Sequence, residues 1–192
     1  MDLRFPLRSA FLAIPLGDAA VTLFGELQDR LRDYVDILSF QKRGSPHLTL
    51  QFWKELMEIE YGQIVHQCET VARQTTPFPL KIEGTGSFGR KGETHMLYLD
   101  VPFNEPLARL KKRCPWPSTP IDGAPPGEER LFRPHVTLAR VTHPQRFRIV
   151  EKEVLKTLKD ISFTMSVDRL RLYANVEAVS QTPLRDFVLA GR

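Results

Sequence analysis

The chain has 192 residues, of which 42% are hydrophobic and 26% are charged, as in a folded globular protein, so extended disorder is excluded. The length fits one compact domain, or one domain made of two similar halves, and no apolar run approaches the roughly 20 residues that cross a bilayer. The net charge of +4 favours an anionic partner such as RNA, although many proteins that bind no nucleic acid carry it too.

The first third of the chain predicts strands and helices in turn. The continuous apolar run within Ser9–Leu16 indicates a central strand. Asp18 is suited to cap a following helix, whose apolar positions 21, 24, 27, 31 and 34 share one face. Short strands are predicted at Ile37–Phe40 and His47–Trp53, and a further helix over Ile59–Thr75.

The middle of the chain predicts two strands, a short helix and a long loop. The strands are expected at Phe78–Ile82 and His95–Val101, with the glycines at 84, 86 and 89 marking the bend between them. A helix is expected at Glu105–Lys112. The segment Pro115–Glu129 is rich in proline and predicts a loop.

The last third predicts one helix among four strands. A strand is expected at Arg133–Val141 and a helix at Ile149–Leu158. Closing strands are expected at Ile161–Val167, Leu170–Asn175 and Phe187–Ala190. Helices and single strands do not alternate strictly, so we predict an α+β fold with helices packed on antiparallel sheets.

Two features bear on where the protein works. The apolar stretch 10–16 follows Arg4 and Arg8, as in a secretory signal, but it leads into a helix pattern and not into a small-residue cleavage site. Cys68 and Cys114 are far apart and show no metal-ligand spacing. We therefore expect a reduced, cytoplasmic protein.

Two tetrapeptides carry the chemistry. Residues 47–50 read His-Leu-Thr-Leu and residues 135–138 read His-Val-Thr-Leu, and each is preceded directly by proline. Side chains alternate along a strand, so His47 and Thr49 share one face, as do His135 and Thr137. One such tetrapeptide is ordinary strand alternation. Two copies in one chain indicate a duplicated functional site.

This set of side chains matches what phosphodiester hydrolysis needs. A base must take a proton from the attacking water, an acid must protonate the departing ribose oxygen, and donors must hold the phosphoryl oxygens. Histidine suits both proton transfers, because its usual pKa of roughly 6.5 lets charged and neutral forms coexist near physiological pH. The hydroxyls of Thr49 and Thr137 could donate to the phosphoryl oxygens.

The motifs resemble the paired His-x-Thr-x signatures of the two-histidine (2H) phosphoesterase superfamily. Several flanking segments are similar to its RNA 2',3'-cyclic phosphodiesterase branch, also called the 2'-5' RNA ligase family. They are the opening strand Phe11–Pro15, the first motif with its trailing aromatic in His47–Phe52, the second motif within Phe132–Arg140, and Leu172 with Tyr173. The likeness spans the whole chain, and the double motif is its specific part.

The resemblance implies a bilobal, pseudo-symmetric α+β fold, with antiparallel sheets lining a central groove and helices outside. Residues 1–192 are then one domain of two lobes with intertwined chain. It also implies hydrolysis of RNA 2',3'-cyclic phosphate ends to 2'-phosphomonoesters, without metal or cofactor, by an enzyme we expect to be a monomer. By analogy His47 is the proton donor and His135 the proton acceptor, and 2'-5' RNA ligation is a possible side activity.

The chain departs from the family pattern at two places. Trp53 and Lys54 replace the usual small, glycine-containing sequel to the first motif, and no serine follows Tyr173. These departures leave the catalytic pair intact but put the substrate preference in doubt. Arg140 closes the second motif and could bind phosphate. Strict alternation places Arg133 on the histidine face and Arg140 opposite, unless the strand bends after Thr137.

Other candidate residues have simpler interpretations. No remaining histidine has a second ligand at metal spacing, so we expect surface or hydrogen-bonded positions for His66, His95 and His143. Aromatic side chains could stack on a base, the candidates being Phe52, Trp53, Phe88 and Tyr173. Alternation places Phe52 on the core side. The basic run 111–113 could touch RNA phosphates, but a solvated helix end is the simpler expectation.

Two alternatives stay open at this point. One is an enzyme of the same superfamily that hydrolyses small cyclic nucleotide phosphates. The other is a nucleotide-binding module that uses the same groove without turnover. Binding alone does not need two proton-transfer groups, so the intact pair of histidines favours an enzyme.

Overall fold

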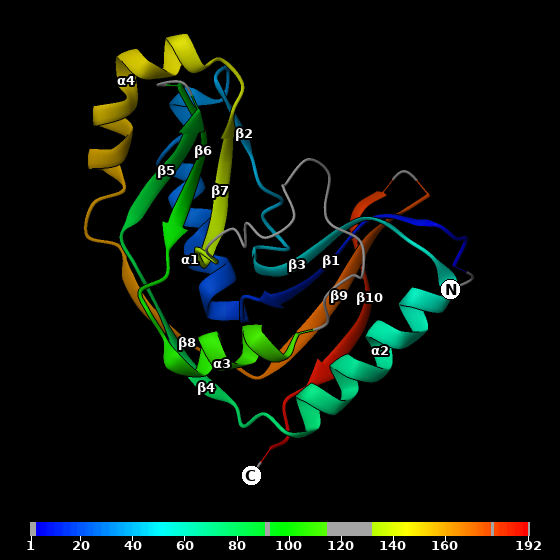
Figure 1. Cartoon of the computed structure of the whole chain (residues 1–192). Coiled ribbons are helices and arrows are strands. Elements are labelled where there is room, and N and C mark those ends of the chain that lie inside the picture. The colour runs from blue at the N-terminus through cyan, green and yellow to red at the C-terminus, as the bar shows by residue number, and fades with distance from the viewer. Residues whose placement is uncertain (1–2, 91–92, 115–131, 178, 192) are drawn as a thin grey trace.

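The computed structural model describes residues 3–90, 93–114, 132–177 and 179–191 (Figure 1). The fold is α+β, as predicted, and the strand pairs of the described residues are antiparallel. The helices are α1 (Asp18–Asp29), α2 (Glu58–Arg73), α3 (Glu105–Arg113) and α4 (Pro144–Thr157). The strands are β1 (Leu7–Pro15), β2 (Leu38–Phe40), β3 (His47–Leu56), β4 (Phe78–Glu83), β5 (Thr85–Arg90), β6 (Glu93–Asp100), β7 (His135–Val141), β8 (Ser162–Val167), β9 (Arg169–Val176) and β10 (Val179–Val188).

One large sheet brings the two motifs together. Its strands follow the order β10-β9-β1-β3-β7-β6-β5, and β2 also pairs with β7. β4 and β8 form a separate two-stranded sheet. The motif strands β3 and β7 are neighbours in the middle of the large sheet, so the site lies where the two halves of the chain meet (Figure 1).

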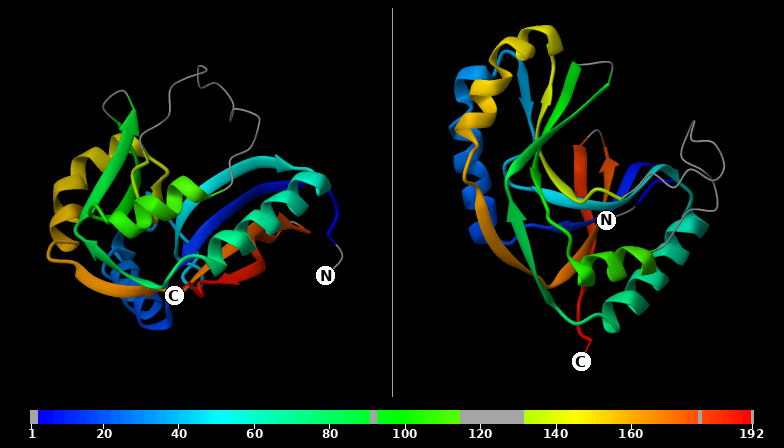
Figure 2. Two further views of the ribbon diagram at one scale, coloured as in Figure 1. Left: turned by 60° about the horizontal axis from the view of Figure 1, so that its bottom comes forward. Right: turned by 60° about the vertical axis from the view of Figure 1, so that its left-hand side comes forward.

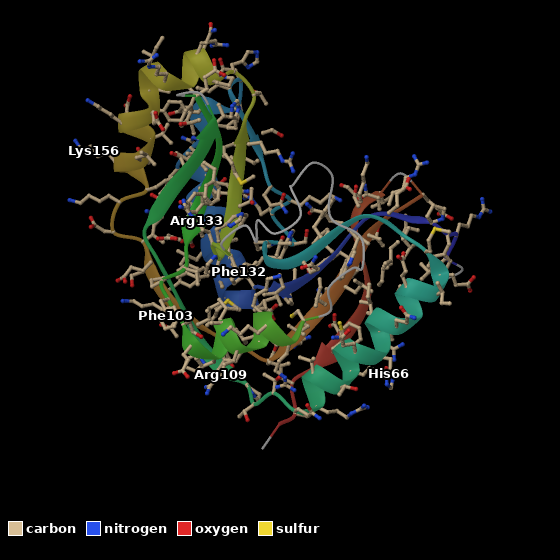
Figure 3. All side chains as sticks on the ribbon, in the orientation of Figure 1. His66, Phe103, Arg109, Phe132, Arg133 and Lys156 are labelled. Carbon is tan, nitrogen blue, oxygen red and sulfur yellow. The ribbon has the colours of Figure 1, made fainter. Side chains whose placement is uncertain are left out.

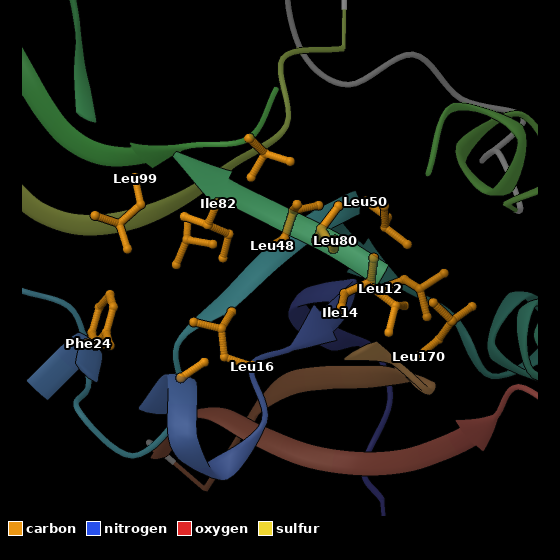
Figure 4. Close-up of a cluster of buried hydrophobic side chains, with 14 of the residues drawn as sticks. Leu12, Ile14, Leu16, Phe24, Leu48, Leu50, Leu80, Ile82, Leu99 and Leu170 are labelled. Carbon is orange, nitrogen blue, oxygen red and sulfur yellow. The ribbon is translucent and has the colours of Figure 1, made fainter. Parts of the chain in front are cut away.

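One face of this sheet packs against the hydrophobic core. Phe24 of α1 is fully buried in the same cluster as Leu12 of β1 and Leu48 of β3 (Figure 4). α2 lies along β9 and β10, and α4 lies beside β6 (Figure 2). No helix in the described part of the chain is long and apolar enough to cross a membrane. The alternate residues of the central strands point away from the core and form the face that carries the motifs.

Glycines caused one strand to be missed from the sequence. Residues 84–89 were expected to be a bend, but β5 occupies Thr85–Arg90 and pairs with β6. Of these three glycines, Gly84 has a positive φ, of 80°. Gly86 lies directly against the ring of Tyr98, where an added Cβ would be 2.4 Å from the ring atoms. The glycine therefore makes room for an aromatic side chain at the edge of the site.

Several element ends also differ from the expectations. Gly17, not Asp18, is the N-cap of α1. Asp18 lies inside the first turn, where its negative charge interacts favourably with the helix dipole. That helix ends at Asp29, so apolar positions 31 and 34 belong to the following turn. α4 and β10 both begin earlier than predicted. The predicted loop Pro115–Glu129 falls outside the described residues.

Candidate active site

The two motif strands pair directly at one point, Leu48 opposite Val136. Both of these side chains are fully buried, whereas the neighbouring histidines and threonines are partly exposed. If this antiparallel register is continued by one residue each way, His47 lies across from Thr137. Residues opposite one another in such a pair have Cβ atoms roughly 4.5–5.5 Å apart. The structure thus places the two motifs side by side, with His135 close enough for its charge to act on His47.

Both imidazole rings are held in the same tautomer. Nδ1 of His47 lies 2.8 Å from the carbonyl oxygen of Ser45, and Nδ1 of His135 lies 2.8 Å from the carbonyl oxygen of Arg133. A carbonyl oxygen can only accept a hydrogen bond, so Nδ1 carries the proton and donates it in each ring. Nε2 is then the nitrogen that can accept or give a proton. Two rings prepared in this way are what an acid–base pair requires.

His47 lies in an aromatic stack. Its ring is stacked on Phe11 of β1 at 4.7 Å between centroids and lies 5.4 Å from the ring of Tyr173 of β9. Phe11 and Tyr173 are themselves stacked at 4.8 Å. Burial lowers the pKa of His47 below its usual value, the hydrogen bond to Ser45 opposes that shift, and the nearby charge of His135 adds to it.

His135 meets its aromatic neighbours edge-on. The centroid of its ring lies 5.0 Å from that of Phe88 of β5, with 79° between the planes, and 5.4 Å from that of Tyr98 of β6, with 63°. Phe88 and Tyr98 stack on each other at 4.2 Å. The hydroxyl of Thr137 donates to the sulfur of Met96, 3.5 Å away. The aromatic residues fix the ring plane of His135 without covering it from both sides.

Each motif strand contains a β-bulge immediately after its threonine. In β3 the register against β1 shifts, and both Leu50 and Gln51 are buried in succession. In β7 the register against β6 shifts in the same way at Leu138 and Ala139. Such a bulge inserts one residue and reverses the alternation that follows. The next residues, 52 and 140, therefore join the histidine face.

The bulges correct one prediction and resolve another. Phe52 was expected in the core, but its side chain is 39% exposed and lies on the face of His47. Arg140 is exposed on the face of His135, which is the outcome that required a bend after Thr137. In β7 the carbonyl of Leu138 accepts hydrogen bonds from the buried Gln28 side chain and from the backbone N–H of Gln41.

The other aromatic and basic candidates divide between site and core. Phe88 and Tyr173 lie at the histidines, as described above, whereas Trp53 is buried in the core. Its indole N–H has no hydrogen-bond partner among the described residues. Arg133 is exposed near Tyr98. Lys111 was expected on a solvated helix end but is only 9% exposed.

The sequence did not single out the residues that position His47. Gln181 of β10 and Gln41 exchange reciprocal amide hydrogen bonds of 3.1 and 3.3 Å. The hydroxyl of Ser45 donates to the same Gln181 oxygen at 3.4 Å, so the carbonyl that holds the His47 ring belongs to an anchored loop. The φ of Gln181 is 58°, a conformation that non-glycine residues rarely adopt.

The remaining histidines stand apart from this site. His66, His95 and His143 are exposed on α2, on β6 and before α4. Across residues 3–90, 93–114, 132–177 and 179–191, no group of three or more His, Cys, Asp or Glu side chains is placed to hold a metal ion.

These observations agree with the match to a known family. A family model described as the 2'-5' RNA ligase superfamily matches residues 19–178. The chain belongs to the 2'-5' RNA ligase superfamily, whose members are 2H phosphoesterases. The fold is therefore a family feature, and the chain is a phosphoesterase.

Individual relatives differ in how finely they are named, and two solved structures match in fold. A Bacillus pumilus protein named "Putative phosphoesterase" is 32% identical over 146 residues, covering 75% of this chain and 79% of that protein. An RNA 2',3'-cyclic phosphodiesterase from Aquifex aeolicus is 25% identical over 149 residues, covering 72% of this chain and 74% of that protein. A crystal structure of a Thermus thermophilus protein matches with a TM-score of 0.70 at 21% identity, covering 95% and 98% of the two chains. E. coli LigT complexed with 3'-AMP matches with a TM-score of 0.65 at 20% identity, covering 96% and 98%.

Proposed function

We propose that this protein hydrolyses RNA 2',3'-cyclic phosphate ends to 2'-phosphomonoesters by metal-independent acid–base catalysis with His47 and His135. The observation that carries the proposal is the pair of rings held with Nδ1–H on a backbone carbonyl, on neighbouring strands that pair at Leu48 and Val136 and close enough for the charge of His135 to act on His47. The name of the Aquifex relative and the nucleotide bound in the LigT structure support an RNA or nucleotide substrate.

The reaction follows from this geometry. Nε2 of His135 accepts a proton from water, whose oxygen attacks phosphorus. As the bond from phosphorus to the ribose 3' oxygen breaks, Nε2 of His47 gives its proton to that oxygen, and the phosphate stays on the 2' oxygen. Thr49 donates a hydrogen bond to one non-bridging oxygen, and Thr137 turns its hydroxyl proton from the sulfur of Met96 to the other. Arg140 adds a positive charge on the same face.

The role of His47 depends on the substrate. In the free protein its lowered pKa favours the neutral ring, which by itself suits a base better than an acid. A bound cyclic phosphate brings a negative charge between the imidazoles and stabilises the charged ring. We therefore assign proton donation to His47 in the complex with substrate, following the family resemblance, and the pH profiles of single-histidine variants test that assignment.

Two other functions compete with this proposal. A small cyclic nucleotide would fit the same four residues, and a binding module would need no proton transfer. The matched tautomers favour turnover over binding alone. Ligation, in which the 5'-hydroxyl of a second RNA replaces water, attacks phosphorus and expels the 3' oxygen to leave a 2'-5' linkage, is a slower side activity in this proposal.

The experiment is an assay of the purified chain, with and without EDTA, on an RNA bearing a 2',3'-cyclic phosphate, alongside His47→Ala and His135→Ala. We expect EDTA to leave the rate unchanged, each variant to retain only about a thousandth of the activity, and the product to carry a 2'-phosphate. Loss of activity with EDTA, or survival of activity in both variants, would contradict the mechanism. Binding of the RNA without any turnover would favour the module.

A further inference from the structure

A pocket of about 580 Å³ opens beside the His135 half of the site. It lies between α3 and the segment just before β7, and Figure 3 labels Phe103, Phe132 and Arg133 in this region. The volume is within the range of roughly 300–1,000 Å³ that is usual for small-molecule sites. Its walls come from the end of β6, from α3 and from residues 132–134.

The pocket is continuous with the catalytic face. Tyr98 lines it and also meets the ring of His135 edge-on at 5.4 Å. Arg133 lines it as well, and its backbone carbonyl holds Nδ1 of His135. A ligand in the pocket would therefore lie next to the reacting phosphate, on the side away from the His47 stack.

The chemistry of the walls fits a nucleotide. Phe103 lines the pocket and is 85% exposed, so its ring is accessible for stacking. Exposed Lys112 and Arg133 supply positive charge for a phosphate, whereas Asp100 supplies a carboxylate whose Oδ1 already accepts from the N–H of Val101. Stacking on an aromatic ring combined with positive charge along the backbone is how proteins bind single-stranded nucleic acid.

Lys111 adds a charge beneath the surface of the pocket. Its ammonium is mostly buried, lies 5.5 Å from the centroid of the Phe132 ring, and donates to Gln51 of β3 at 3.0 Å. Burial lowers the pKa of Lys111. Because burying a charge is costly, a phosphate near this lysine would offset part of that cost. The basic run on α3 thus contributes one buried and one exposed cation to the same pocket.

We propose that this pocket binds the nucleotide on the 5' side of the cyclic phosphate end, with its base on Phe103 and its phosphate near Lys112 and Arg133. An RNA chain that ends in a 2',3'-cyclic phosphate can continue only on the 5' side, so a subsite next to the reacting nucleotide selects chains over mononucleotides. The inference rests on the proposed function and narrows its substrate to RNA of two or more nucleotides.

The test compares a mononucleotide 2',3'-cyclic phosphate with a dinucleotide that ends in one, using the full chain. We expect the wild type to have a kcat/KM about tenfold higher on the dinucleotide, since a base stacked on an aromatic ring adds to binding. Phe103→Ala and Lys112→Ala should each remove most of that preference and leave the mononucleotide rate within twofold. Phe103→Trp should retain the preference.

Arg109→Ala is the matched control. This residue is exposed on the same helix and pairs with Glu105, but it does not line the pocket. The Arg109→Ala change should leave kcat/KM unchanged on both substrates. If Phe103→Ala and Lys112→Ala lower kcat/KM equally on both substrates, or leave it unchanged on both, the assignment of the pocket is wrong. Failure of the wild type to hydrolyse either substrate would instead overturn the proposed function, so the two failures are distinguishable.

Discussion

The two halves of the site share a backbone and differ in what surrounds the histidine. Each half has a motif strand, a bulge after the threonine and a ring held by the carbonyl two residues before it. The ring of His47 lies face-on against aromatic neighbours, whereas His135 meets its neighbours edge-on. After the bulge the first half presents Phe52 and the second presents Arg140.

This difference shows how a duplicated strand can produce an asymmetric site. Acid and base must differ in proton affinity at the same pH, and proteins achieve this by giving similar groups different surroundings. Here burial lowers the pKa of His47, and the positively charged residue after the bulge, Arg140, lies in the half of His135.

The largest effect is expected when the histidine of either half of the site is removed. His47→Ala and His135→Ala should each lower kcat by about a thousandfold, within the range for loss of a general acid or base. The double variant should be slower than either single one, because the remaining ring still transfers its proton, but by less than the product of the two losses, because both rings act in one reaction step. Measured rates on one RNA substrate check this. Effects that multiply in the double variant would indicate two independent contributions.

A smaller effect is expected from the residue that follows each bulge. Arg140→Ala should lower kcat/KM roughly 10- to 100-fold, since a charged hydrogen bond to phosphate is lost. Phe52→Ala, the matched change in the other half, should lower it less than fivefold because no charge is removed. Steady-state kinetics on the mononucleotide substrate compare the two. Equal losses would contradict the assignment of phosphate binding to the half of His135.

A further prediction concerns the support of the His47 ring. Gln181→Gly keeps the left-handed backbone accessible but removes the amide that anchors Ser45. We expect kcat to fall severalfold with KM little changed, and the ring nitrogen NMR signals of His47 to show a mixture of tautomers. Unchanged signals together with reduced activity would mean that Gln181 acts on something other than the His47 ring.

The smallest expected effect is on stability. The folded protein disfavours the charged form of His47, so the unfolded chain binds more protons below the usual histidine pKa of roughly 6.5. The contribution of His47 is therefore present at higher pH and is lost as the pH falls. Thermal melts at pH 8 and pH 5 should show the wild type losing stability relative to His47→Gln. A difference that does not change with pH would contradict the role of burial.

Much of the site was predictable because strand alternation is a local property. The positions of His47, Thr49, His135 and Thr137 follow from the motifs alone. The bulges were not predictable, since nothing local in the sequence marks the extra residue at 50 or 138. The bulges put the fifth residue after each histidine on the histidine face. The sequence pattern therefore placed Phe52 on the wrong face.

Contacts between distant segments account for the rest. β5 was missed because its glycines resemble a turn, whereas in the fold Gly86 accommodates the ring of Tyr98. Lys111 resembled a solvated helix end, but α3 packs so that its ammonium meets Gln51 of a strand 60 residues earlier. Neither the contact of Gly86 with Tyr98 nor that of Lys111 with Gln51 can be recognised from the residues around it in a single sequence.

The central claim is that one histidine gives a proton while the other takes one, and the pH dependence of kcat/KM tests it most directly. The wild type should give a bell-shaped profile. With His135→Ala, the residual rate should fall only as the pH rises, because His47 must be protonated. With His47→Ala, it should fall only as the pH drops, because His135 must be neutral. Reversed limbs would exchange the two roles, and profiles that are flat in both variants would contradict acid–base catalysis by this pair.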